Sequence, residues 1–244
     1  MRDIDKYAKD YSKEGFESIQ EKFRRRKLIE VLNEFKPKEI LDIGCGMKPL
    51  FTELKNVSFE KYICIEPSID LYNNAEKESE TVKNVKCIND FYPSNKLKNE
   101  KFDFIICSSL LHEIENQESF VTSIKENCNK NSHVYFCVPN ANSFHRILAT
   151  RMGIIKDVKQ ITERNIELQQ NNVFDKFLIK ELLEKCGFQI EQSGTFFIKP
   201  FTHKQMYGAY KEKIIDEKVL EGLYNSSNDF PENGSELYVI AKLK

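Results

Sequence analysis

The chain has 244 residues, of which 40% are hydrophobic and 31% are charged, and its formal net charge is −1. A chain of this length can bury most of its apolar surface in one hydrophobic core, so its fold needs neither disulfides nor a structural metal. Because the net charge is close to zero, strong general attraction to nucleic acid or to an anionic membrane is not expected.

The first half of the chain alternates between helical and extended patterns. Apolar residues at helical spacing over 14–35 predict a helix, which Pro37 ends. Further helices are expected near 49–54, 68–80 and 117–129, between strands at 39–43, 61–65, 85–88, 102–107 and 133–138. The fourth strand is an almost unbroken apolar run, as is typical of a parallel strand covered on both faces. This alternation predicts an α/β fold with a doubly wound, mostly parallel sheet.

The pattern changes after Pro139. Residues 140–172 are polar with helical pieces, and 200–233 are expected to lie outside the sheet. An amphipathic helix over 174–186 ends at Gly187, and strands follow at 188–198 and 235–242. We expect one domain over 1–244, made of an N-terminal helical cap (1–36), a ligand-binding core (37–139), cap insertions (140–173 and 199–234) and the end of the sheet (174–198 and 235–244).

The cysteines predict a reducing environment. None of the seven forms a C-x-x-C pair, and four lie within predicted strands: Cys64, Cys87, Cys107 and Cys137. Buried thiols behave as small hydrophobes, so we expect no disulfide and no structural zinc. The charged start of the chain does not resemble a signal peptide, and no stretch reaches the ~20 apolar residues of a membrane-spanning helix. These features predict a cytoplasmic protein without a membrane partner.

A glycine turn follows the first predicted strand. Gly44 and Gly46 let the backbone turn sharply and approach a ligand closely. Such a turn lies at the carboxyl end of a strand, where open α/β sheets bind ligands. Glu66 ends the second strand 22 positions after Gly44, close to the spacing of about 20 expected of a carboxylate that binds ribose hydroxyls. At the end of the third strand, residues 89–91 offer a hydrogen-bond acceptor and an apolar wall for an adenine.

Two residues around the glycine turn distinguish between cofactors. A dinucleotide fingerprint needs a third glycine so that pyrophosphate can reach the helix N-terminus, and Pro49 stands at that position. Asp42 places a negative charge beside the turn, which repels phosphate but suits a cofactor that carries an ammonium and a sulfonium. The turn therefore favours S-adenosylmethionine (SAM) over NAD, and an NAD-dependent oxidoreductase is disfavoured.

These motifs together resemble the class I SAM-dependent methyltransferases. The resemblance covers roughly 35–200 and 235–243, and it is carried by ILDIGCG at 40–46, by Glu66 and Asp90, and by KFDFIICSSLLHE at 101–113. The family implies a seven-stranded sheet whose last strand is antiparallel, with S-adenosylhomocysteine (SAH) as the product.

A narrower likeness follows the fifth strand. The segments at 138–146, 152–153 and 162–164 resemble a bacterial branch related to ubiquinone-type methyltransferases, whose members often occur in capsule and surface-polysaccharide biosynthesis. Relatives in that branch commonly carry a Gly-His pair where this chain has Gln169 and Gln170. A base supplied by that histidine would be missing here.

The resemblance implies a set of cofactor contacts. It assigns the methionine end to the glycine turn, the ribose to the end of the second strand, and the adenine to the end of the third. Ser108, Ser109 and Leu110 would lie under the cofactor. Apart from the resemblance, Tyr11 is a candidate to close over the cofactor as part of a lid, although chain termini are often loose. The full set is Asp42, Gly44, Cys45, Gly46, Glu66, Pro67, Ser68, Asn89, Asp90, Phe91, Ser108, Ser109, Leu110 and Tyr11, with no metal.

Two mechanisms of methyl transfer remain open. Histidine titrates near neutral pH, so His112 and His145 are candidate bases for an alcohol acceptor, although His112 could cap a helix and His145 could pack the cap. An anionic acceptor needs no base but needs nearby cations, which Arg146, Arg151 or Lys199 could supply. The missing family histidine favours this second mechanism. The basic run at 22–27 could grip phosphate or form the solvated face of a helix.

The sequence thus predicts a methyltransferase that O-methylates a small polar or anionic acceptor in capsule or surface-polysaccharide biosynthesis, including a phosphoramidate or a sugar nucleotide group. A quinone-like or other small metabolite, and a SAM-binding protein without catalysis, are the alternatives. Nucleic acid is disfavoured as a partner. Enzymes that methylate the amino groups of bases carry a motif of Asp or Asn, two prolines and an aromatic residue after the fourth strand, whereas this chain has SSLL at 108–111. A monomer and a homodimer are both compatible with the sequence.

Overall fold

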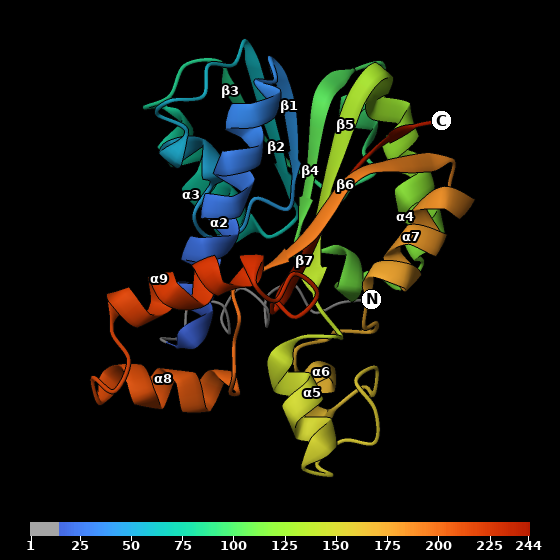
Figure 1. Ribbon diagram of the computed structural model, residues 1–244. Helices are drawn as coiled ribbons and strands as arrows, with labels where there is room; N and C mark the ends of the chain where they lie inside the picture. Colours follow the sequence, from blue (N-terminus) through green and yellow to red (C-terminus); the bar gives the residue numbers. More distant parts are fainter. Residues whose placement is uncertain (1–14) are drawn as a thin grey trace.

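The computed structural model describes residues 15–244, and these form a seven-stranded sheet between two layers of helices (Figure 1). The strand order is β3-β2-β1-β4-β5-β7-β6. The strands are β1 (Glu39–Ile43), β2 (Lys61–Glu66), β3 (Val85–Asn89), β4 (Phe102–Ser108), β5 (Cys128–Pro139), β6 (Phe188–Phe196) and β7 (Glu236–Leu243). Strands β1 to β5 pair in parallel, whereas β7 is antiparallel to both β5 and β6. The predicted sheet with an antiparallel last strand is confirmed.

Strand alternation divides the core between the two faces of the sheet. On one face, Ile40 belongs to the cluster that includes Phe23 of α2 (Phe16–Phe35) and residues of α3 (Ile69–Ser79). On the other, Leu41 belongs to the cluster formed with α4 (Gln117–Ile124) and α7 (Lys176–Lys185). Successive side chains of a strand point to opposite faces, so neighbouring residues of β1 enter different clusters. Both faces are therefore covered, as the apolar strands predict.

The remaining helices lie outside the sheet. They are α5 (Phe144–Arg151), α6 (Glu163–Glu167), α8 (His203–Lys211) and α9 (Glu217–Asn225). Figure 1 shows them beyond the end of the sheet toward which β4 and β5 point. They come from the two segments that the sequence places outside the sheet, 140–172 and 200–233. Within residues 15–244, no helix has the length and apolarity needed to cross a membrane.

Two predicted helices are shorter in the structure. The one expected near 49–54 is a single 3₁₀ turn, η1 (Leu50–Glu53), which a bond from the N–H of Leu54 to the carbonyl of Phe51 closes. The one expected at 117–129 ends at Ile124, where the 3₁₀ segment η4 (Lys125–Asn127) follows. Strand β5 then starts five residues before the predicted start at His133. These first residues are mostly polar, so no apolar pattern predicts that the strand already pairs with Phe102 there. The other 3₁₀ segments are η2 (Asn95–Leu97), η3 (Leu111–Glu113) and η5 (Ser226–Asn228).

All seven cysteines are buried and unbridged. Cys64 and Cys87 are register partners on β2 and β3, with their sulfur atoms 3.0 Å apart. Across residues 15–244, no group of three or more histidine, cysteine or acidic side chains is arranged to hold a metal ion.

Candidate functional site

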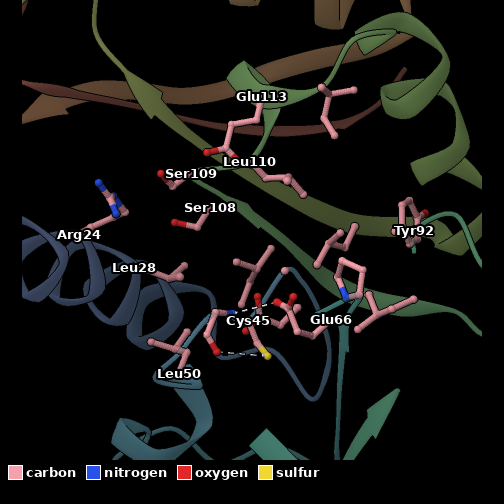
Figure 2. A pocket seen from close by; sticks show the side chains of 18 of the residues that line it. Arg24, Leu28, Cys45, Leu50, Glu66, Tyr92, Ser108, Ser109, Leu110 and Glu113 are labelled. Carbon is pink, nitrogen blue, oxygen red and sulfur yellow. Dashed lines mark hydrogen bonds between the residues drawn. The ribbon is translucent and has the colours of Figure 1, made fainter. Parts of the chain in front are cut away.

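A pocket of about 400 Å³ opens at the carboxyl ends of β1, β2 and β4 (Figure 2). The strand order reverses between β1 and β4, because β1 leads to β2 on one side and β4 to β5 on the other. Such a reversal leaves a crevice where open α/β sheets bind ligands, and small-molecule sites span about 300–1,000 Å³. Within residues 15–244, ten residues that the sequence singles out line this pocket: Asp42, Gly44, Cys45, Gly46, Glu66, Pro67, Phe91, Ser108, Ser109 and Leu110.

The glycine turn forms one wall of the pocket. Gly44 and Gly46 have φ angles of 79° and 66°, in the left-handed region that L side chains rarely adopt. The N–H of Gly44 donates to the carbonyl of Ile65 at 2.9 Å, which ties the turn to the end of β2. A Cβ on Gly46 would meet nothing within 4 Å, so backbone conformation rather than space requires glycine there.

Asp42 is a buried carboxylate on β1, with 4% of its surface exposed. The hydroxyl of Tyr62 donates to its Oδ2 at 2.7 Å. Burial raises the pKa of Asp42 to about 6, against the opposing effects of the Tyr62 hydrogen bond and of Arg25, while Glu66 adds to the rise. A positively charged ligand beside Asp42 would favour the ionised carboxylate.

Glu66, at the end of β2, is hydrogen-bonded to the glycine turn. Its Oε2 accepts from the N–H of Gly46 at 3.2 Å (Figure 2), and its Oε1 accepts from the N–H of Ser68 at 3.0 Å. Ser68 is buried and caps α3, so it orients Glu66 and does not line the pocket. Glu66 is 5% exposed and lines the pocket, and a carboxylate can accept hydrogen bonds on both of its oxygens.

The end of β3 reaches the pocket through one of its three predicted residues. Phe91 lines the pocket, whereas the side-chain amide of Asn89 donates to the carbonyls of Glu66 and Pro67 at 2.9 and 3.2 Å. Asp90 does not line the pocket. It accepts from the hydroxyl of Ser94 at 2.7 Å and from the N–H of Phe91, and the Ser94 hydrogen bond lowers its pKa.

Tyr92 is a pocket residue that the sequence reasoning missed. Its hydroxyl donates to Asn127 Oδ1 of η4 at 3.0 Å, which fixes the position of the ring. The sequence signal that could have identified Tyr92 is its position next to Phe91, just after the end of β3. The two aromatic rings line the pocket together and offer an apolar wall.

The end of β4 carries a backbone conformation that its sequence does not suggest. Ser109 has a φ of 57°, and its N–H donates to the carbonyl of Cys137 at 2.8 Å. A residue with a Cβ in the left-handed region costs roughly 1–2 kcal/mol, and such strain is concentrated at functional sites. The bend brings Ser108, Ser109 and Leu110 into the pocket wall.

Helix α2 supplies two arginines that the resemblance did not assign to the pocket, Arg24 and Arg25. Arg24 reaches Glu236 at 2.8 Å and Glu17 at 3.0 Å. Arg25 reaches two carboxylates as well, Glu21 at 3.1 Å and Glu53 at 2.7 Å. The basic run at 22–27 thus contributes two pocket residues, but each is already matched by two acidic partners.

Acidic side chains outnumber basic ones on the pocket wall. Among its described lining residues there are two arginines and no lysine, and the carboxylates are Glu21, Asp42, Glu66, Glu113 and Glu115. Opposite charges attract and like charges repel, so this wall favours a cation and disfavours a pyrophosphate. The donor set therefore fits a cofactor that carries an ammonium and a sulfonium.

The two candidate histidines do not line the pocket. His112 is 2% exposed, and its Nε2 lies 3.8 Å from Oε1 of its neighbour Glu113, which does line the pocket. His145 is held in the cap near Lys199 and His203, and burial, with these cations, lowers its pKa to about 2. A histidine with so low a pKa is too weak a base to remove a proton at neutral pH, so its placement does not support a catalytic role. Tyr11 and its lid role lie outside the described residues.

The other candidate cations also lie away from the pocket wall. Lys199 is buried, its Nζ donates to Gln20 Oε1 at 3.2 Å, and burial lowers its pKa to about 8. Arg146 donates to the carbonyls of Val158 and Gln160 in its own cap, at 2.6 and 2.5 Å. These contacts indicate structural roles in the caps.

Comparisons with known proteins agree with this fold. A family profile described as a methyltransferase domain matches residues 17–193. The chain is similar to a putative methyltransferase in complex with a methyltransferase activator from Haloferax volcanii, with a TM-score of 0.66 and 10% identity over 100% of this chain and 98% of that one. No curated protein matches the sequence.

Two further solved structures contain SAH. The plantazolicin methyltransferase in complex with a triazolic desmethyl analog and SAH gives a TM-score of 0.60 at 16% identity, over 99% of this chain and 91% of that one. The magnesium protoporphyrin IX methyltransferase from Synechocystis with bound SAH gives 0.58 at 12%, over 90% and 82%. At these identities the likeness shows a shared fold.

Proposed function

The chain belongs to the methyltransferase-domain family, and on this basis we propose that its pocket binds SAM and that a small polar acceptor receives the methyl group, with SAH as the product. The observation that supports this most strongly is that Asp42 and Glu66 line one pocket together with the glycine turn, to which Glu66 is hydrogen-bonded. Two buried carboxylates at that place suit a nucleoside that carries positive charge.

Each part of the wall has a proposed role in binding. Glu66, held by the N–H groups of Gly46 and Ser68, accepts hydrogen bonds from the ribose hydroxyls. Asp42 pairs with the ammonium of the methionine end, and Phe91 packs against the adenine. The cofactor supplies a methyl group on a sulfonium, which is already strongly electrophilic. What the chain must then do is align the acceptor and exclude water.

The proposed acceptor is small and polar, and the resemblance favours methylation on oxygen over nitrogen. The resemblance over 138–146 supports a place in capsule or surface-polysaccharide biosynthesis in the cytoplasm, with a sugar nucleotide or a phosphoramidate as acceptor. We favour the sugar hydroxyl, because the acidic side chains of the pocket wall would repel an anionic phosphoramidate.

Calorimetry with SAH tests the proposal. We expect the wild-type protein to bind SAH and not NAD⁺, and Asp42→Ala and Glu66→Ala each to weaken SAH binding by about tenfold or more, roughly 1.4 kcal/mol. The matched control is Glu60→Ala. Glu60 is exposed, directly precedes β2 at the end away from Glu66, and pairs with Lys38, so SAH affinity should be unchanged. Unaltered SAH affinity in both pocket variants, or tight NAD⁺ binding, would refute the proposal.

A further inference from the structure

We infer that Glu113 is the pocket carboxylate that meets the methyl acceptor, and that the acceptor is a hydroxyl or amine group without negative charge beside it. The inference rests on the proposed function. It assigns to Glu113 the removal of the acceptor's proton, which the sequence suggested for the neighbouring His112. It also narrows the substrate class, because it disfavours acceptors with a negative charge next to the reacting atom.

Location is the first argument for Glu113. The residue belongs to η3, directly after the bend at Ser109 and Leu110, and it is buried yet lines the pocket. Figure 2 shows Glu113 and Ser109 on the side of the pocket across from Cys45 and Glu66. Glu66 and the glycine turn account for one side of the site, so Glu113 belongs to the side left for the acceptor.

Charge is the second argument. An anionic acceptor needs cations that have capacity left for it, and the two pocket arginines each contact two carboxylates. Such an acceptor would also meet the acidic groups of Glu113 and Glu115 on the wall. Like charges at close range in a partly buried site repel strongly, so a phosphate or carboxylate next to the reacting atom is disfavoured. A hydroxyl or an amine instead donates to the carboxylate.

The chemistry of such an acceptor balances with Glu113 as proton acceptor. The lone pair of the acceptor oxygen or nitrogen forms the new bond to the methyl carbon, and the carbon–sulfur bond breaks with its electrons left on sulfur. The proton of the acceptor moves to the carboxylate of Glu113 and from there to water. Ser108 and Ser109 place two hydroxyls on the same wall, where they can orient the acceptor by hydrogen bonds.

Two cofactor analogues test this without knowledge of the acceptor. SAH has a neutral sulfur, whereas in sinefungin an amine-bearing carbon replaces the methylated sulfur, so its ammonium projects where the methyl group would. A charge-assisted hydrogen bond to Glu113 should make wild-type protein bind sinefungin about tenfold more tightly than SAH. Glu113→Gln should lose most of that ratio and keep its SAH affinity within about twofold.

The controls separate this inference from the proposed function. Glu118→Gln changes an exposed glutamate outside the pocket and should keep the wild-type ratio. Glu113→Asp withdraws the carboxylate by one methylene and should give a ratio of sinefungin to SAH affinity between those of wild type and Glu113→Gln. This variant tests the inference if Glu113→Gln does not fold. A ratio that Glu113→Gln and Glu113→Asp leave unchanged overturns the inference while SAH binding upholds the proposed function. If wild-type protein binds neither analogue, the proposed function itself fails.

Discussion

At the scale of single residues, Asp42 shows how burial and function oppose each other. Burial holds the pKa of this carboxyl at about 6, so near neutral pH the folded protein keeps a charge that its surroundings disfavour. The charge costs stability in the absence of a cationic ligand, and in the proposed function it pairs with the ammonium of the cofactor. Stability is commonly reduced at sites that bind ligands.

Asp42→Asn should therefore stabilise the ligand-free protein at high pH. The folded pKa of about 6 lies above the ordinary value of 3.8, so the destabilisation grows as pH rises between these values and is complete above pH 6. A difference of about two pKa units corresponds to about 3 kcal/mol in the free energy of unfolding. In urea denaturation, Asp42→Asn should exceed wild type by up to that amount at pH 8, and the gap should close near pH 4. A gap that does not change with pH would contradict this.

At the scale of elements, a buried ion pair joins the first helix to the last strand. Arg24 of α2 contacts Glu236 of β7 at 2.8 Å, and the amide of Gln20 also donates to Glu236, whose side chain is 0% exposed. Removal of one partner from a buried pair leaves an uncompensated charge, which is more costly than the absence of both. The pair thus holds α2, and with it the arginine side of the pocket, against the sheet.

A double-mutant cycle measures this connection. Arg24→Met should lower the free energy of unfolding by about 3–5 kcal/mol, because Glu236 stays buried and charged. Glu236→Gln in the same chain removes that charge but keeps an oxygen for Gln20, so the double variant should be more stable than Arg24→Met alone. Additive losses in urea denaturation would mean that the two side chains do not interact.

At the scale of the whole molecule, the pocket connects parts of the chain that are far apart in sequence. Its wall combines α2, the ends of β1, β2 and β4, and η3, so a bound ligand contacts all of them at once. A ligand that binds only the folded state stabilises the entire cooperative unit.

SAH should accordingly raise the melting temperature. At 100 times its dissociation constant it adds about 2.7 kcal/mol, and for a chain of this size that corresponds to about 5–10 °C. At the same SAH concentration, Glu66→Ala should show a much smaller shift in a thermal melt because its affinity is lower. An equal shift in both proteins would show that stabilisation does not come from this pocket.

Much of this arrangement could be predicted from sequence because it depends on local patterns. The apolar runs predicted the strands. The spacing of Asp42, the glycine turn and Glu66 predicted that these three features line one pocket. The start of β5 could not be predicted, since its first residues are polar and their pairing with Phe102 is set by a distant strand. Asp90 shares its position at the end of β3 with Phe91, yet a hydrogen bond to Ser94 holds it away from the pocket wall.

By itself, the sequence determined the sheet, the glycine turn and the acidic strand ends, because each follows from residue type and spacing along a few consecutive positions. Only the tertiary structure decided which side of the site each later residue reaches. Glu113 rather than His112 lines the pocket, and two arginines of α2 line it already matched by acidic partners. The physical reason is that side-chain direction after a bend, and the pairing of charges between distant segments, depend on packing in three dimensions.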